Sequence, residues 1–126
     1  MKHYFLQLMG FHSFNLFRSC RLVVDTGIHA MGWTRQRAVD YLLENTALSP
    51  EFVDLEVDRY ITNPGQATSY KIGEIQIQNL RKELEKELGK MFDVKQFHRH
   101  LLDCFGPLNT LDGCVRFAMN QSTDRP

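Results

Sequence analysis

Apolar residues recur along most of this chain at intervals of three and four positions, the period of a helix with one buried face. The spacing and the capping signals predict five helices, over residues 4–30, 34–45, 49–62, 64–88 and 93–106. Thr34, Ser49 and Asp93 are predicted N-caps, and Gly89 is a predicted C-cap. Since no segment shows the alternation of a strand, the sequence predicts an all-α fold.

The apolar residues within each segment predict which face of the helix is buried. These inward residues are Ala38, Tyr41, Leu42, Val53, Val57, Tyr60, Ile61, Ile77, Leu80, Leu84, Leu88, Phe97, Leu101, Leu102 and Phe105. The charged run at residues 81–87 is interpreted as a solvated helix face with i, i+4 ion pairs rather than a partner-binding patch. Residues 109–126 turn polar toward the end and are predicted to form a loose tail.

Composition restricts the function classes. The 126 residues include 15 basic and 15 acidic side chains, so no charge excess indicates a nucleic-acid partner. A hydrophobic content of 43% argues against wholesale disorder. Cys20, Cys104 and Cys114 form no Cys-x-x-Cys pair and are odd in number, which argues against a disulfide framework. Reduced thiols, and therefore the cytoplasm, are favoured.

The N-terminal segment, residues 1–17, fits either a helix or a weak signal-like segment. It has a basic start and an apolar run, but polar residues at positions 7, 12, 13 and 15 interrupt the run, and no small-x-small cleavage site follows. We favour the helix. The run is too short and too broken to span a bilayer, so no membrane span is expected.

A first candidate for chemistry lies on the predicted first helix. Arg21, Asp25 and His29 are spaced i, i+4, i+8 and fall on one face. Asp25 would orient His29 and favour its imidazolium form, which can act as an acid or donate a hydrogen bond to a developing oxyanion. The alternative is structural: an Arg21–Asp25 helix pair, with His29 stabilised near the helix C-terminus.

A second candidate follows the Pro-Gly turn at residues 64–65. Gln66 and Tyr70, with Gly73 or Glu74, lie on one predicted helical face. The phenol of Tyr70 would stabilise negative oxygen beside a scissile carbonyl, and a glycine one turn later leaves room for a ligand. The alternative is a half-buried tyrosine whose hydroxyl reaches a backbone carbonyl.

Several strings share one order with a known family: residues 18–34, 38–46, 56–61, 64–67 and 70–74, and more weakly 92–93 and 97–98. Together they resemble the domain of unknown function 885 family, a group of zinc-peptidase-like proteins. The match runs over residues 14–108 and corresponds to the C-terminal part of a typical member. The resemblance implies a multi-helix array like the C-terminal helical part of a gluzincin-like metallohydrolase, with residues 1–108 forming that region.

In such proteins a His-Glu-x-x-His helix and a later Glu hold zinc, and these segments lie upstream of the matching stretch. This chain has five histidines, at positions 3, 12, 29, 98 and 100, and none is paired in that frame. We therefore expect no metal site or cofactor in this chain, and zinc only in a full-length relative. By position, His29 and Tyr70 are candidate transition-state donors, with Asp25 as the orienter of His29.

Two functions remain open. In the first, the chain is the C-terminal fragment of a zinc-dependent, peptidase-like hydrolase, inactive alone, with Arg21 and Gln66 as substrate contacts. Its partner would be the missing N-terminal zinc-binding half, and a full-length relative would act on a peptide-like substrate. In the second, the chain is a non-catalytic helical module that binds another helical protein through an exposed apolar face.

Overall fold

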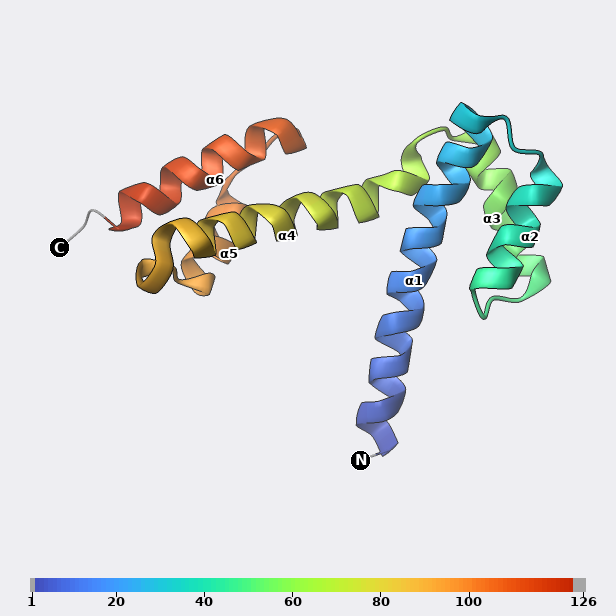
Figure 1. Cartoon of the computed structure of the whole chain (residues 1–126), viewed down its shortest axis with the longest axis horizontal. Helices are drawn as coiled ribbons and strands as arrows, with labels where there is room; N and C mark the ends of the chain where they lie inside the picture. Colours follow the sequence, from blue (N-terminus) through green and yellow to red (C-terminus); the bar gives the residue numbers. More distant parts are fainter. Residues whose placement is uncertain (1, 124–126) are drawn as a thin grey trace. The chain divides into compact units, whose positions relative to one another are not determined.

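The computed structural model describes the backbone of residues 2–123 and the side chains of residues 4–121. This part of the chain forms six α-helices and no strand (Figure 1). The helices are α1 (Lys2–Met31), α2 (Arg35–Asn45), α3 (Pro50–Thr62), α4 (Ser69–Leu88), α5 (Val94–Asp103) and α6 (Leu108–Thr123). Two 3₁₀ turns, η1 (Gln66–Thr68) and η2 (Gly89–Met91), flank α4. The prediction of an all-α fold is confirmed.

Local capping chemistry sets the starts of three helices as predicted. The side chain of Thr34 accepts the N–H of Arg37 at 3.2 Å, and that of Ser49 accepts the N–H of Phe52 at 3.4 Å. Asp93 accepts the N–H of Lys95 at 2.7 Å. Each oxygen satisfies a backbone donor that has no partner within the first turn of its helix.

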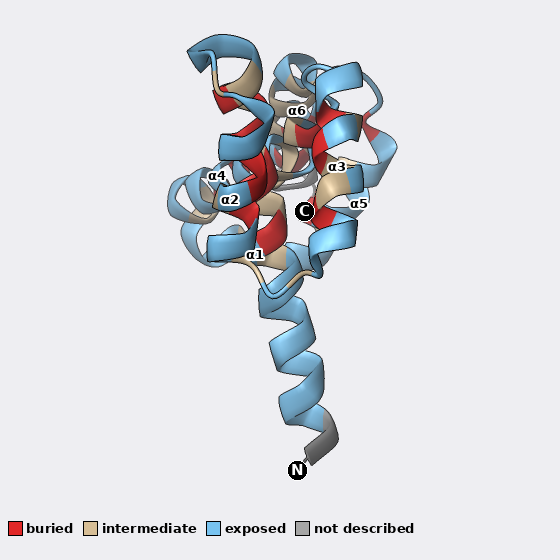
Figure 2. Ribbon diagram, turned by 90° about the vertical axis from the view of Figure 1, so that its right-hand side faces the viewer, coloured by how far each residue is buried: buried red, intermediate tan, exposed pale blue. Residues whose placement is uncertain are grey.

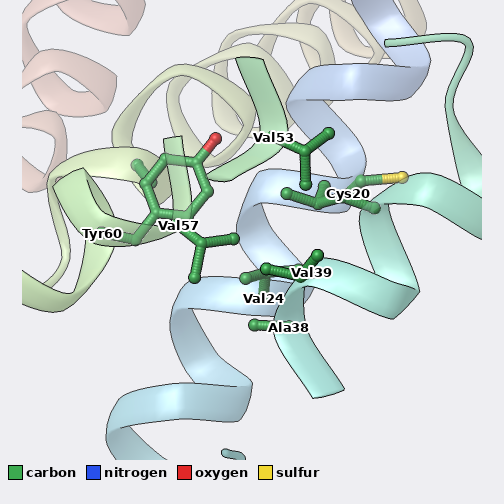
Figure 3. Packing of buried hydrophobic residues seen from close by; sticks show 9 residues of the cluster. Cys20, Val24, Ala38, Val39, Val53, Val57 and Tyr60 are labelled. Atoms are coloured by element: carbon green, nitrogen blue, oxygen red, sulfur yellow. The ribbon is translucent and has the colours of Figure 1, made fainter. Parts of the chain in front are cut away.

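The chain divides into two compact units, Met1–Ile72 and Gly73–Pro126. The core of the first unit forms where the second half of α1 meets α2, α3 and η1 (Figure 3). Its buried residues are Cys20, Val24, Ala38, Val39, Leu42, Val53, Val57, Tyr60 and Ala67. The inward residues predicted for α2 and α3 are buried or half-buried there, except Ile61, which is exposed.

The end of α1 is fixed by a close contact between a glycine and an indole. Gly32 has φ +65°, and the N–H of Trp33 donates to the carbonyl of Gly27 at 2.9 Å. The Trp33 ring then lies against Gly27, where a Cβ would come within 2.5 Å of a ring carbon. Only glycine at position 27 allows the ring to pack this closely.

The first half of α1 is apolar but exposed, as Figure 2 shows. Its large exposed side chains are Tyr4, Phe5, Leu6, Leu8, Met9, Phe11, Phe14 and Leu16. At 100° per residue these positions are distributed around the whole helix circumference rather than along one stripe. The segment is helical, as favoured from the sequence. No helix among the described residues is both long and apolar enough to cross a membrane.

The second unit has its own core, built from α4, α5 and α6. Leu80, Leu84, Phe97, Cys104, Val115 and Met119 are buried in it. Leu102 and Phe105, predicted to face inward, are instead 75% and 91% exposed. Helix α5 ends at Asp103, earlier than expected, so Phe105 lies beyond it and does not follow the helical period.

Residues 109–123, expected as a loose tail, belong to α6, and residues 124–126 lie outside the described residues. Val115 and Met119 anchor α6 in the core, and Cys114 forms a disulfide with Cys104. The expectation of reduced thiols is therefore wrong for this pair. The turn and the first part of α6 between the two cysteines, which are ten positions apart, bring the sulfurs together, and a count of cysteines does not reveal this.

Arg116 joins α6 to the charged run of α4. Its guanidinium pairs with Asp112 at 2.7 Å, with Glu87 at 2.9 Å and with Glu83. Within the run itself, Arg81 and Glu85 form the expected i, i+4 pair at 2.8 Å. One side of the run is therefore the solvated face predicted from the sequence, while Glu83 and Glu87 hold the neighbouring helix.

Candidate functional site

Arg21 is the centre of a polar cluster in the first unit. Only 8% of its surface is exposed, and its guanidinium carbon lies 5.7 Å from the ring centres of Phe17 and Tyr60 and 5.5 Å from that of Tyr70. Its Nη2 donates to Oε1 of Gln66 at a long 3.4 Å, whereas its buried Nε has no hydrogen-bond partner. The cation is therefore surrounded by aromatic faces and incompletely paired.

Tyr70, at the start of α4, covers two guanidinium groups at once. Its ring centre lies 5.4 Å from the guanidinium carbon of Arg18, in addition to its contact with Arg21. The side chain is 57% exposed, and no described group forms a hydrogen bond with its hydroxyl. The alternative of a half-buried tyrosine bonded to a backbone carbonyl does not describe this arrangement.

Gln66 connects the cluster to α3. Its Oε1 accepts Nη1 of Arg59 at 2.7 Å as well as the longer bond from Arg21. Arg59 in turn forms a two-point pair with Glu56, at 3.1 and 2.7 Å. The hydroxyl of Tyr60 donates to Oε2 of Glu56 at 2.6 Å. Figure 3 shows the hydroxyl of Tyr60 directed away from Ala38, at the border of the core.

The electrostatics of this network centre on Glu56. Burial acts to raise the pKa of Glu56, but the hydrogen bonds from Arg59 and Tyr60 and the charges of Arg59 and Arg21 outweigh it and lower the pKa. The pKa of Tyr60 is raised, first by burial and then by its bond to the Glu56 carboxylate. Glu56 is thus ionised and Tyr60 neutral at physiological pH.

Asp25 is 97% buried and has a different partner from the one predicted. Its Oδ1 and Oδ2 both lie 3.1 Å from the backbone nitrogen of Gly65, which donates to them. Gly65 has φ +80°, a conformation that glycine adopts at little cost. Asp25 therefore fixes the turn that presents Gln66 and Tyr70, and no hydrogen bond joins it to His29 among the described residues.

His29 lies at the exposed end of α1. Its Nε2 is 2.9 Å from the carbonyl oxygen of Tyr60, so Nε2 carries the proton of this bond. The other ring nitrogen, Nδ1, has no partner among the described groups. The structure thus places Arg21 within hydrogen-bond distance of Gln66 and against the ring of Tyr70. The imidazole of His29 is bonded instead to the backbone of α3.

Sequence reasoning missed Glu56, Arg59 and Tyr60 as members of the cluster. Their i, i+3, i+4 spacing on one helix was the available signal, because it places the three side chains on a common face. Among the described residues, no group of three or more His, Cys, Asp or Glu side chains is placed to hold a metal ion. Zinc ligation does not fit the residues of this part of the chain.

The fold and cluster define a helical protein of two small units, with a polar, arginine-rich site in the first. The model of the family described as bacterial protein of unknown function (DUF885) matches residues 5–112, and the chain belongs to this family. The matched range contains all five predicted site residues. A search of curated proteins gives no match.

A solved structure is also similar: the crystal structure described as that of "the putative lipoprotein from Colwellia psychrerythraea". It shares 39% sequence identity with this chain, with a TM-score of 0.83 over 86% of the chain. The match covers 19% of the Colwellia protein, so the present chain spans about a fifth of that relative's length.

Proposed function

We propose that this chain is the C-terminal helical part of a zinc-dependent, peptidase-like hydrolase and supplies substrate contacts rather than the metal. The observation that carries the proposal is the placement of the exposed Tyr70 phenol over the guanidinium groups of Arg18 and Arg21, beside Gln66. Hydrogen-bond donors in a positive environment are suited to negative charge that develops on a reacting carbonyl oxygen.

In this proposal Tyr70 donates to the developing oxyanion, and Arg21 and Gln66 contact the substrate. His29 is the second donor. Because its Nε2 is engaged with the Tyr60 carbonyl, donation to substrate would come from Nδ1 of the imidazolium form. Asp25 contributes through the Gly65 turn, which positions Gln66. In this proposal any zinc would be held by residues outside this chain, since the residues that the structure describes do not fit it.

Kinetics of a full-length, active relative test the proposal. Substitutions equivalent to Tyr70→Phe and His29→Ala should each lower kcat by about 10²-fold or more, because each removes a transition-state donor. Arg37→Gln is a matched control, since Arg37 is exposed and stacks on Trp33 within the same unit. Unchanged kcat in both test variants would remove these residues from the mechanism.

A non-catalytic interaction module is the second candidate. It is favoured by the apolar first half of α1, whose side chains at residues 4–16 are largely exposed. The coding region upstream of Met1 discriminates between the two candidates. An in-frame His-Glu-x-x-His followed by a later Glu supports the hydrolase, whereas a verified start at Met1 supports the module.

A further inference from the structure

We propose that Arg18, Arg21, Gln66 and Tyr70 form a binding site for a carboxylate group, specifically the free C-terminal carboxylate of a peptide. The inference deepens the function proposed above and rests on it for the peptide nature of the ligand. The carboxylate itself is argued from the contacts of these four side chains.

Arg21 is a buried cation without a direct ion-pair partner among the described residues. It is 92% buried, no carboxylate of the described residues forms an ion pair with it, and its Nε donor is unsatisfied. Its one hydrogen bond goes to a neutral amide oxygen at 3.4 Å. Buried charges are costly unless they are paired and hydrogen-bonded. A ligand carboxylate would provide the missing countercharge.

The surroundings of Arg21 carry excess positive charge. Arg18, Arg21 and Arg59 gather around Tyr70 and Gln66. Two carboxylates belong to the same network, and both are engaged: Glu56 is bound by Arg59 and Tyr60, and Asp25 accepts the N–H of Gly65. The oxygen of Gln66 is occupied by two guanidinium groups, which leaves its NH₂ as a donor without an acceptor among the described residues. The Nε of Arg21, the NH₂ of Gln66 and the hydroxyl of Tyr70 can therefore all donate to a ligand.

The cluster is accessible and suited to a monoanion. Gln66 and Tyr70 are exposed at its rim, so a ligand can approach from solvent and contact Arg18 and the Gln66 amide first. Rotation of the exposed Tyr70 ring would then uncover Arg21. A guanidinium matches the planar, two-oxygen geometry of a carboxylate. The fixed negative charge of Glu56 disfavours a dianion such as phosphate at the same place.

NMR titration of the intact 126-residue chain tests this site. The Nε–Hε signal of Arg21 is followed while N-acetyl-Ala-Ala is added, with N-acetyl-Ala-Ala-amide as the neutral match. We expect a saturable shift with the acid and none with the amide. Equal shifts with both peptides, or no shift with either, would overturn the proposal.

Two further probes distinguish the source of the anion. N-acetyl-Ala-Asp-Ala-amide carries only a side-chain carboxylate, and inorganic phosphate carries none. Both should bind at least tenfold more weakly than N-acetyl-Ala-Ala. Tighter binding of either would refute the assignment to a peptide terminus.

Variants complete the test. Arg18→Gln, which removes a half-buried side chain outside the core, should raise the Kd for N-acetyl-Ala-Ala at least tenfold. Arg37→Gln removes the same charge elsewhere in the unit and should leave the Kd unchanged. An unaltered Kd in Arg18→Gln argues against the site. Because binding is read without metal or turnover, this result is independent of the kinetic test of Tyr70 and His29.

Discussion

Both carboxylate oxygens of Asp25 lie 3.1 Å from the backbone nitrogen of Gly65, forty positions further along the chain. This bond joins α1 to the turn before η1. It uses a nearly fully buried carboxylate to hold a backbone segment that no helix hydrogen bond orders. The position of the turn that carries Gln66 therefore depends on Asp25, a residue of α1 forty positions away in the sequence.

Replacing Asp25 with Ala should lower the free energy of unfolding by about 1–3 kcal/mol, because the N–H of Gly65 loses its acceptor. Urea denaturation followed by circular dichroism measures the change. Asp40→Ala is the control, since Asp40 is exposed and accepts only an i, i+4 bond from Gln36. Equal stability of the two variants would show that the Asp25–Gly65 bond is dispensable.

Gly27→Ala should destabilise the first unit by about 1–3 kcal/mol, because the added methyl would overlap the Trp33 ring. Trp33 is the single tryptophan of the chain, so its fluorescence reports the displacement directly. Gly10→Ala lies in the same helix, but no atom is within 4 Å of the added Cβ, so this variant should not lower the stability. A similar emission spectrum and midpoint in both variants would contradict the packing described.

Removing the disulfide with Cys104→Ala and Cys114→Ala together should destabilise the second unit by about 3 kcal/mol, since the unfolded chain regains the freedom of a loop whose ends are ten positions apart. Faster amide hydrogen exchange at Val115 and Met119 would show the effect within α6. Before reduction, thiol labelling of the denatured protein should modify Cys20 alone. Labelling of all three cysteines would indicate that the bond does not form.

Glu56 should make stability depend on pH. Its pKa in the folded state is below the ordinary 4.5, so its contribution is fully present above that value and is lost as the pH falls through the folded pKa. Wild type should therefore exceed Glu56→Gln in unfolding free energy by more at pH ~7 than at pH ~3. A constant difference across this range would show that the Arg59–Glu56–Tyr60 network does not stabilise the ionised form.

Helix starts were predictable because capping is local. Thr34, Ser49 and Asp93 each act on a backbone donor two or three residues away, and the sequence contains both partners. The exposure of Phe105 was not predictable in this way, because it depends on where α5 ends. The helix formed by residues 108–123 was missed because its core contacts and its disulfide come from distant segments.

The candidate site shows the same division. The sequence offered Arg21 in one candidate stripe and Gln66 and Tyr70 in another, and the contact of Arg21 with Gln66 and with the Tyr70 ring was not visible in either spacing. The pairing of Asp25 with His29 had only helical spacing in its favour, and the turn at Gly65 provides Asp25 with a buried donor instead. Whether Asp25 binds His29 or the Gly65 N–H is decided by tertiary structure, and the spacing of residues in the sequence does not reveal it.

Among the described side chains of α1, Phe17 is the first that is buried, so the thirteen described side chains before it, from Tyr4 to Leu16, contribute none to the core of the first unit. The intact chain should self-associate and bind to apolar chromatography media through this segment. A shortened version beginning near Asn15 offers a tractable form for titration, and loss of a biological effect on shortening would assign that effect to the deleted turns.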